Sequence, residues 1–311
     1  MSTRFGYACI NTTLQQNEGV QSNRGMIKRT WLAKGISYAS ELSLINVKAL
    51  KRIIEWNTEH GIEVFRISSC LFPWMSEYDI FDLPDIDEIA DTLKEAGNIA
   101  KENNQRLSFH PGQFCVLASP NESIVTKTVK ELNDTSIIMD LLGMPSNHSA
   151  KINIHIGGAY GDRASALERF CKNVDKLSYG ARSRLTVEND DKPNMYSTKM
   201  LYDGVYTRTG IPIVFDSHHF TLGPQDQSYS EAINMAASTW GDIRPTCHHS
   251  NSKKNYEDPS VPACSHSAWY YEPFDSDNLS VDVVLECKKK ELALFKYLQD
   301  FVPGARIKNA A

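Results

Sequence analysis

The sequence lacks the features that mark secreted and membrane-spanning proteins. No apolar run approaches the roughly 18 residues that a membrane-spanning helix needs. The first residues, MSTRFGYACINTT, show no charged start followed by an apolar run and a small-residue cleavage site, so we expect no signal peptide. The seven cysteines are odd in number and never spaced as C-x-x-C, which favours reduced thiols. We therefore expect a protein of the cytosol or nucleus that is not secreted.

An excess of positive charge is also missing. The formal net charge is −5 at pH 7, so no global positive field would attract nucleic acid. A local basic patch or bound metal cations can still attract phosphate, so the net charge weakens that expectation without excluding it. The sequence contains no internal repeat and no low-complexity tract. Its 311 residues suit one α/β domain, which we place at 1–311.

Short apolar, β-branched segments alternate with helical stretches along the whole chain. Residues 84–103, 122–142 and 288–301 carry apolar side chains on one helical stripe. Eight alternations of this kind predict a TIM (β/α)8 barrel. An open, doubly wound sheet is the alternative, but the first strand-to-helix turn has no G-x-G-x-x-G. The predicted strands are 4–10, 63–69, 106–112, 151–158, 185–190, 212–218, 243–250 and 282–288.

Two segments are predicted to be long loops. Residues 11–46 are polar and would lie over one end of the barrel. Residues 251–281 exceed the usual length of a loop, which favours a lid or a binding loop.

Six of the predicted strands end in a side chain that binds metals. One such ending is unremarkable, since a lone histidine is usually structural and a lone acid often caps the next helix. Because the carboxyl ends of barrel strands meet at one rim, six endings in order indicate one shared site. The six residues are His110, His155, Glu188, Asp216, His248 and Glu286.

Side-chain parity separates neighbouring histidines. Residues two apart on a strand share a face, so His248 lies with Thr246 and Ser250 and points inward, whereas His249 points outward.

After Asp216, we choose His219 as the second ligand of a D-x-x-H pair that spans the strand end. His218 remains the alternative. Mixed imidazole and carboxylate ligands suit Mn²⁺ or Zn²⁺ better than Mg²⁺ alone. Two or three such ions suit phosphodiester hydrolysis: one lowers the pKa of a bound water to give hydroxide, and the others stabilise the attacking and leaving oxygens.

These segments resemble the ultraviolet-damage endonucleases. HPGQF (110–114) and LECKKKE (285–291) are specific when found together, and the resemblance runs through all eight predicted strands. The other matching segments are GYACIN (6–11), RISSCLFPW (66–74), NIHIGG (153–158), VEND (187–190), FDSHH (215–219) and the H-x-S at 248–250. The resemblance implies a TIM barrel related to endonuclease IV. It also implies an enzyme that nicks damaged double-stranded DNA immediately 5′ of pyrimidine dimers and (6-4) photoproducts, and often of abasic sites.

By resemblance, His266 joins the metal ligands, although its own surroundings in the second long segment would leave it a surface residue. Glu188, His248 and Glu286 are the ligands expected to be catalytic. The implied cofactor is two or three Mn²⁺ ions, with Zn²⁺ or Mg²⁺ as alternatives. The full ligand set is His110, His155, Glu188, Asp216, His219, His248, His266 and Glu286.

The resemblance also implies residues that contact DNA. Gln113 and Phe114 match a pair that the family inserts into the duplex at the lesion. Tyr7 and Asn11 match residues that help hold the extruded nucleotides. An aromatic wedge can replace lost stacking, and damage makes unstacking cheaper.

Arg29 and Lys253 are our candidates for phosphate contacts, because both lie in segments that can reach the carboxyl-end rim. We expect a monomer, with no membrane contact, in the nucleoid-associated cytoplasm or the nucleus.

The chain departs from the family pattern at three positions. Phe114 stands where tyrosine is common, Thr246 where a metal-site lysine is familiar, and Glu77 where histidine often follows serine. Two alternatives therefore stay open. One is a metal-dependent sugar isomerase or epimerase, which would need no wedge. The other is a catalytically weak protein that binds damaged DNA without cutting it.

Overall fold

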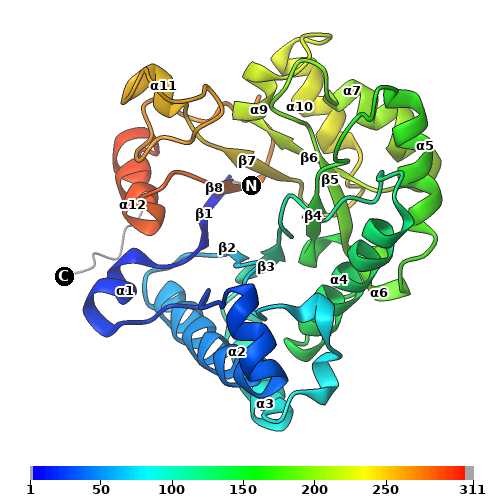
Figure 1. The fold of residues 1–311 in the computed structure, drawn as a ribbon. Coiled ribbons are helices and arrows are strands. Elements are labelled where there is room, and N and C mark those ends of the chain that lie inside the picture. Colours follow the sequence, from blue (N-terminus) through cyan, green and yellow to red (C-terminus); the bar gives the residue numbers. More distant parts are fainter. Residues whose placement is uncertain (1–2, 305–311) are drawn as a thin grey trace.

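Eight parallel strands, each paired with its neighbours in chain order, close into a barrel (Figure 1). The computed structural model describes residues 3–304. The barrel closes where β1 pairs with β8 from Arg4↔Asp282 to Tyr7↔Leu285. The predicted TIM barrel is confirmed, and every strand ends earlier than predicted. The strands are β1 (Arg4–Cys9), β2 (Val64–Ile67), β3 (Arg106–Phe109), β4 (Ile152–Ile154), β5 (Leu185–Glu188), β6 (Ile213–Asp216), β7 (Thr246–His249) and β8 (Asp282–Leu285).

Helices cover the outside of the barrel, with α2 beside α3 and α1 beside α12 (Figure 1). The three predicted helices are confirmed as α3 (Ile86–Glu102), α4 (Glu122–Leu141) and α12 (Lys290–Phe301). No helix in the range 3–304 is both long and apolar enough to cross a membrane. The other α-helices are α1 (Thr12–Glu18), α2 (Lys28–Glu59), α5 (Arg163–Val174), α6 (Tyr179–Arg184), α7 (Thr198–Leu201), α8 (Thr207–Thr209), α9 (Ser217–Leu222), α10 (Tyr229–Ser238) and α11 (Lys253–Tyr256). Single helical turns are η1 (Met75–Glu77), η2 (Ile80–Asp82), η3 (His148–Ala150) and the π-helical η4 (Tyr202–Tyr206).

The predicted loop at 11–46 is wrong, because α1 and most of α2 occupy it. In the part of α2 up to residue 46, three of the five buried residues are polar (Ser40, Ser43 and Asn46), and the hydrophobic pattern assigns such residues to the solvent-facing side. Ser40 Oγ donates to Asp85 Oδ2 at 2.7 Å, and Asn46 Nδ2 donates to the carbonyl of Leu71 at 3.0 Å. Hydrogen bonds of this kind satisfy polar groups inside a core. The segment 251–281 matches its prediction better, since its only helix is the short α11.

Apolar side chains fill part of the inside of the barrel. Ala8, Val64 and Val284 form a small apolar cluster inside it, separate from the main core between barrel and helices. Gly6 allows β1 to approach β2 closely, because a Cβ atom there would overlap the carbonyl group of Val64.

An ion-pair network closes the amino end of the barrel. Asp282 begins β8 and is fully buried. Its carboxylate accepts two hydrogen bonds from Arg4, both at 2.7 Å, and one from Arg106 at 2.9 Å. Arg244 Nη1 lies 3.5 Å from the same carboxylate. Buried charge at this end is therefore matched by protein groups.

Candidate metal centre

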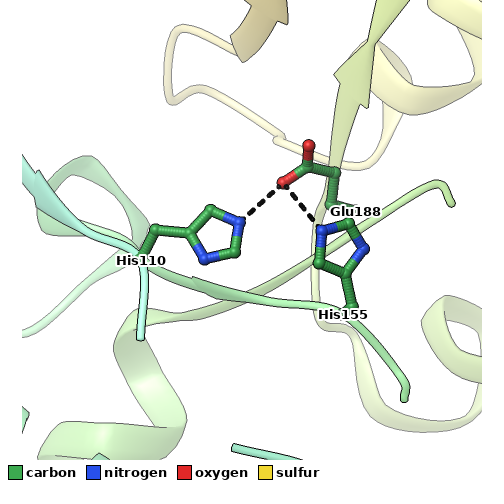
Figure 2. Close-up of side chains that lie close together, drawn as sticks. All are labelled: His110, His155 and Glu188. Atoms are coloured by element: carbon green, nitrogen blue, oxygen red, sulfur yellow. Dashed lines mark hydrogen bonds and ion pairs between the residues drawn. The ribbon is translucent and has the colours of Figure 1, made fainter. Parts of the chain in front are cut away.

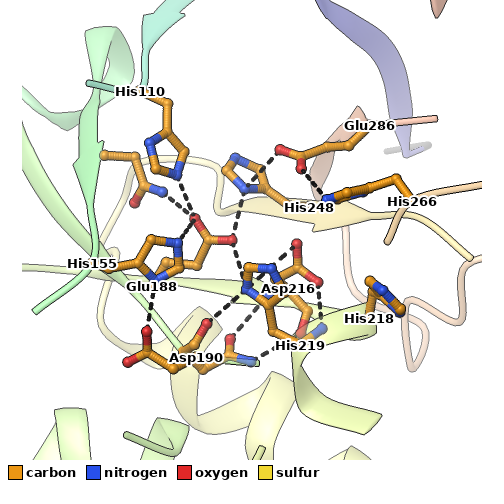
Figure 3. Close-up of polar contacts among 12 residues, drawn as sticks. His110, His155, Glu188, Asp190, Asp216, His218, His219, His248, His266 and Glu286 are labelled. Atoms are coloured by element: carbon orange, nitrogen blue, oxygen red, sulfur yellow. Dashed lines mark hydrogen bonds and ion pairs between the residues drawn. The ribbon is translucent and has the colours of Figure 1, made fainter. Parts of the chain in front are cut away.

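The acidic and imidazole side chains predicted as metal ligands meet at the carboxyl end of the barrel (Figure 3). His110 and His155 directly follow β3 and β4, and Glu188 and Asp216 end β5 and β6. These side chains converge because parallel strands deliver their last residues to one rim.

Glu188 lies at the middle of this cluster and is almost completely buried. One carboxylate oxygen, Oε2, is 3.1 Å from His110 Nε2 and 3.9 Å from His155 Nε2 (Figure 2). The same oxygen accepts a short hydrogen bond from Asn153 Nδ2. The other oxygen, Oε1, is 3.1 Å from His248 Nδ1. Glu188 therefore faces two sets of imidazoles with its two oxygens.

Two groups of side chains in this cluster have the spacing of metal ligands, and they share Glu188. The first is His110, His155 and Glu188, and the second is Glu188, Asp216 and His248; within each group the ligand atoms lie within 4.8 Å of one another. A carboxylate shared between two groups is suited to bridge two cations. The described residues thus offer two candidate groups of ligands for divalent ions.

His219, and not His218, turns toward Glu188. Asp216 ends β6 and caps α9, accepting a hydrogen bond from the His219 N–H at 2.8 Å. This turn brings His219 Nδ1 within 3.4 Å of Glu188 Oε1. The ring of His218 instead lies 5.6 Å from the ring of His266.

Glu286 extends the cluster toward the long segment after β7. Its Oε1 lies 3.4 Å from His248 Nδ1, and its Oε2 lies 4.0 Å from His266 Nε2. An antiparallel bridge between Ser252 and His266 holds the long segment there. Arg66 of β2 donates a short hydrogen bond to Glu286 Oε1.

His249 points away from the cluster, as parity predicts. Its Nδ1 is 2.7 Å from Ser217 Oγ and its Nε2 is 3.2 Å from the carbonyl of Glu272. Both ring nitrogens are occupied by protein atoms, so His249 has a structural role.

The residues present fit bound divalent cations. Within residues 3–304, Asp216 Oδ2 and His266 Nδ1 are buried and have no hydrogen-bond partner. Buried polar atoms are normally satisfied, so such atoms beside a cluster of acids indicate a ligand. The oxygen and imidazole set suits Mn²⁺ or Zn²⁺.

The electrostatics of the acids and of His110 favour metal binding. Burial raises the pKa of Glu188, but the charges of His248 and His155 outweigh it and hold that pKa well below its usual range. Burial also raises the pKa of Glu286, but the charges of Arg66 and His248 outweigh it and hold that pKa well below its usual range. Burial lowers the pKa of His110 to about 4. Metals bind to ionised carboxylates and to neutral imidazoles, which are the states that these shifts favour for Glu188, Glu286 and His110. Burial lowers the pKa of His155, but the charges of Glu188 and Asp190 outweigh it and raise that pKa to about 10, so His155 must lose a proton when it binds a metal.

The sequence interpretation missed several polar residues beneath and beside the ligands. Lys151 and Asn153 share the inward parity of His155, and Asp190 shares that of Glu188, so parity was the available signal. Asp190 Oδ1 lies 3.2 Å from His155 Nδ1. Lys151 is fully buried, and burial lowers its pKa to about 7.

The predicted wedge lies next to the metal ligands. Gln113 and Phe114 are exposed, and the ring of Phe114 is 82% exposed. Both line a cleft of about 850 Å³ whose wall also includes His155 and His219. The exposed ring of Phe114 is therefore accessible to a ligand that enters this cleft.

Tyr7 and Asn11 lie in the interior of the protein. Both are fully buried, and Asn11 Nδ2 donates to the Tyr7 hydroxyl at 2.9 Å, which in turn donates to Asn57 Oδ1 at 2.8 Å. Asn11 also caps α1 through the N–H of Leu14. These contacts fix the pair between β1 and α1, and the contact of Tyr7 and Asn11 with extruded nucleotides stays a prediction.

The two candidate phosphate contacts lie on the carboxyl-end side, since each begins a helix that follows a barrel strand. Arg29 is exposed near the start of α2. Lys253 begins α11 and lies 3.8 Å from Asp258. Glu77 lies outside the cluster and accepts a hydrogen bond from Lys127 at 2.8 Å.

Comparison with known proteins gives one consistent group of relatives. A model of the family described as "UV-endonuclease UvdE" matches residues 3–311. A UV DNA damage endonuclease of Clostridium perfringens is 31% identical over 303 residues, which cover 94% of this chain and 69% of that protein. The crystal structure of SacUVDE superposes with a TM-score of 0.81 at 30% identity, over 96% of this chain and 97% of that one.

A more distant solved structure shares the barrel alone. The D-psicose 3-epimerase of Clostridium cellulolyticum H10 has a TM-score of 0.53 at 16% identity, over 76% of this chain and 78% of that one. Many chemistries use this barrel, so a likeness at that level carries no argument about function.

Proposed function

This chain belongs to the UV-endonuclease UvdE family, and on that premise we propose that it hydrolyses the phosphodiester bond immediately 5′ of a lesion in double-stranded DNA. Membership makes it an endonuclease that repairs ultraviolet damage. The proposal adds the position of the nick and a substrate range of pyrimidine dimers, (6-4) photoproducts and abasic sites. We propose that it acts as a monomer, in the nucleoid-associated cytoplasm or the nucleus.

One observation carries this proposal: the exposed Phe114 and the ligands His155 and His219 line the same cleft. A nuclease that recognises damage must bring its reactive centre and its probe of base stacking to one stretch of backbone. A sugar isomerase or epimerase acts on a small free substrate and needs no exposed wedge beside its metals. The geometry therefore favours the nuclease over that alternative.

We propose Mn²⁺ as the cofactor, with two or three ions. Such ions would lower the pKa of a coordinated water and neutralise charge on the phosphate. Glu188 would hold the ions together with the imidazoles around it, and the hydrogen bond from Asn153 orients its carboxylate. The expected catalytic residues are Glu188, His248 and Glu286. The full proposed ligand set is His110, His155, Glu188, Asp216, His219, His248, His266 and Glu286.

On the DNA, we propose that Gln113 and Phe114 enter the duplex and that the ring replaces the stacking lost at the lesion. The cleft of about 850 Å³ offers space for displaced nucleotides. Arg29 and Lys253 would contact phosphates. Removal of one phosphate contact should reduce the slope of log affinity against log salt by about 0.9.

The test is a nicking assay on supercoiled plasmid. Irradiated and untreated plasmids are incubated with the protein, either with Mn²⁺ or with a chelator. We expect nicks only in irradiated plasmid with Mn²⁺, and mapping of the ends should place them 5′ of the lesions. Irradiated plasmid that stays intact while the protein still binds it would favour the damage-binding alternative. Equal cutting of both plasmids would show that the protein does not recognise lesions.

A further inference from the structure

A lysine is buried directly beneath the candidate metal centre. Lys151 immediately precedes β4 and has the inward parity of Asn153 and His155. Its side chain is 0% exposed. Lysine is almost never fully buried unless it has a partner. Here the partner is an imidazole: Lys151 Nζ lies 3.1 Å from His248 Nε2.

The two nitrogens of His248 face different surroundings. Nδ1 is directed at the acids, 3.1 Å from Glu188 Oε1 and 3.4 Å from Glu286 Oε1. Nε2 is directed at Lys151. A histidine that binds a metal through one nitrogen is usually oriented by the contact of the other. Lys151 occupies the position of that second contact.

The strand that carries His248 offers no such contact of its own. Thr246 lies two residues before His248 on the inward face of β7 and is buried. Within the described part of the chain, its Oγ1 has no hydrogen-bond partner. Lys151 reaches His248 from β4, which is separated from β7 by β5 and β6.

We propose that Lys151 is a positioning residue for His248, holding the ring from below so that Nδ1 faces Glu188 and Glu286. This inference rests on the proposed function, because it treats His248 as a ligand of the nuclease centre. It assigns to this buried amine the orientation of a ligand and no contact with DNA.

The test removes the amine and keeps the length of the side chain, in Lys151→Met. Mn²⁺ affinity is measured by calorimetry on the full chain, and the His248 ring signals are recorded by NMR in the metal-free protein. We expect Mn²⁺ affinity to fall about 10- to 100-fold, as for other partners that orient a ligand, together with altered His248 signals. The matched control is Lys199→Met, since Lys199 is exposed and paired with Asp203.

A second variant places an amine near His248 from a different strand. In Lys151→Met combined with Thr246→Lys, the lysine rises from β7 beneath the same ring, and we expect much of the lost affinity to recover. If Lys151→Met does not fold, Lys151→Gln replaces it and the same two measurements are made. Wild-type Mn²⁺ affinity and unchanged His248 signals in Lys151→Met would overturn the assignment, as would an equal loss in the control. Neither measurement uses DNA, so a wild type that binds Mn²⁺ but leaves irradiated plasmid intact would count against the nuclease alone.

Discussion

The two ends of the barrel carry buried charge in opposite ways. At the amino end, the carboxylate of Asp282 is enclosed by Arg4, Arg106 and Arg244. At the carboxyl end, Glu188 and Asp216 face mainly imidazoles, and Asp216 Oδ2 has no hydrogen-bond partner within residues 3–304.

We interpret this difference as a division between charge that stabilises the fold and charge that is available to bind a cation. A buried ion pair that is fully matched loses several kcal/mol when one partner is removed, because the other charge is left uncompensated. An acid cluster with unsatisfied atoms costs stability by itself and is compensated when cations bind. The amino end should therefore respond to mutation in stability, and the carboxyl end in metal binding and activity.

The largest effect is expected for Glu188→Gln. Loss of the shared carboxylate should reduce nicking of irradiated plasmid at least about 10³-fold, since metal ions supply several kcal/mol of charge stabilisation. It should also abolish the rise in melting temperature that Mn²⁺ gives the wild type. Glu95→Gln is the control, because Glu95 is exposed and paired with Lys51. A Glu188→Gln variant that nicks normally would contradict the assignment of the metal centre.

The converse change is Asp282→Asn at the amino end. It should lower the free energy of unfolding by about 3–5 kcal/mol, because three arginines lose their carboxylate. Denaturant titration measures this loss, and the folded variant should keep its Mn²⁺ affinity. In the control Asp300→Asn, an exposed pair with Lys296 is removed, which should cost less than about 1 kcal/mol. If Asp282→Asn lowered the free energy of unfolding no more than Asp300→Asn does, the network would not be stabilising.

Phe114→Ala tests the wedge on the carboxyl-end side. Loss of one stacking ring should weaken binding to lesion-containing duplex by about 1–3 kcal/mol, or about 5- to 150-fold, without changing Mn²⁺ affinity. Binding is measured by fluorescence anisotropy on duplexes with and without a lesion. Tyr179→Ala is the control, because Tyr179 is 80% exposed and lies in α6, which leads into the amino end of β5. If both variants bound alike, the wedge would have no role.

The smallest effect is expected for Glu131→Gln in α4. Burial, and then the charge of Asp134, raise the pKa of Glu131. An acid whose pKa is raised by folding stabilises the protein only at low pH, and this stability is lost as the pH rises through the raised pKa. The variant should therefore be more stable than the wild type at pH 7, and the difference should shrink toward about pH 4. Melting temperatures across this range measure it, with the exposed Glu168→Gln as the control. A variant less stable at pH 7 would contradict the sign.

Much of this architecture could be predicted from local patterns. Alternation of strands and helices gave the barrel, and a period of two turned His248 inward and His249 outward, as the contacts of both rings show. The D-x-x-H spacing put His219 ahead of His218, and the turn into α9 brings His219 to Glu188.

Other features were out of reach for the same patterns. The hydrophobic pattern predicts a loop over the first part of α2, because Ser40 and Asn46 are buried polar residues whose partners lie far along the chain. The hydrogen bond between Tyr7 and Asn11 in the interior is another contact that local patterns do not predict. No local pattern reports a partner dozens of residues away, so these roles depended on packing.

By itself, the sequence determined which side chains stand at the carboxyl ends of the strands, because strand parity and strand–helix alternation are local properties of the chain. Only the closed barrel decided how those side chains meet. Its closure sets the distances between strands, so it made Glu188 the shared carboxylate and brought Lys151 from β4 beneath His248 of β7. It also set Arg66 against Glu286 and three arginines around Asp282, because contacts across the barrel exist only once β8 has paired with β1.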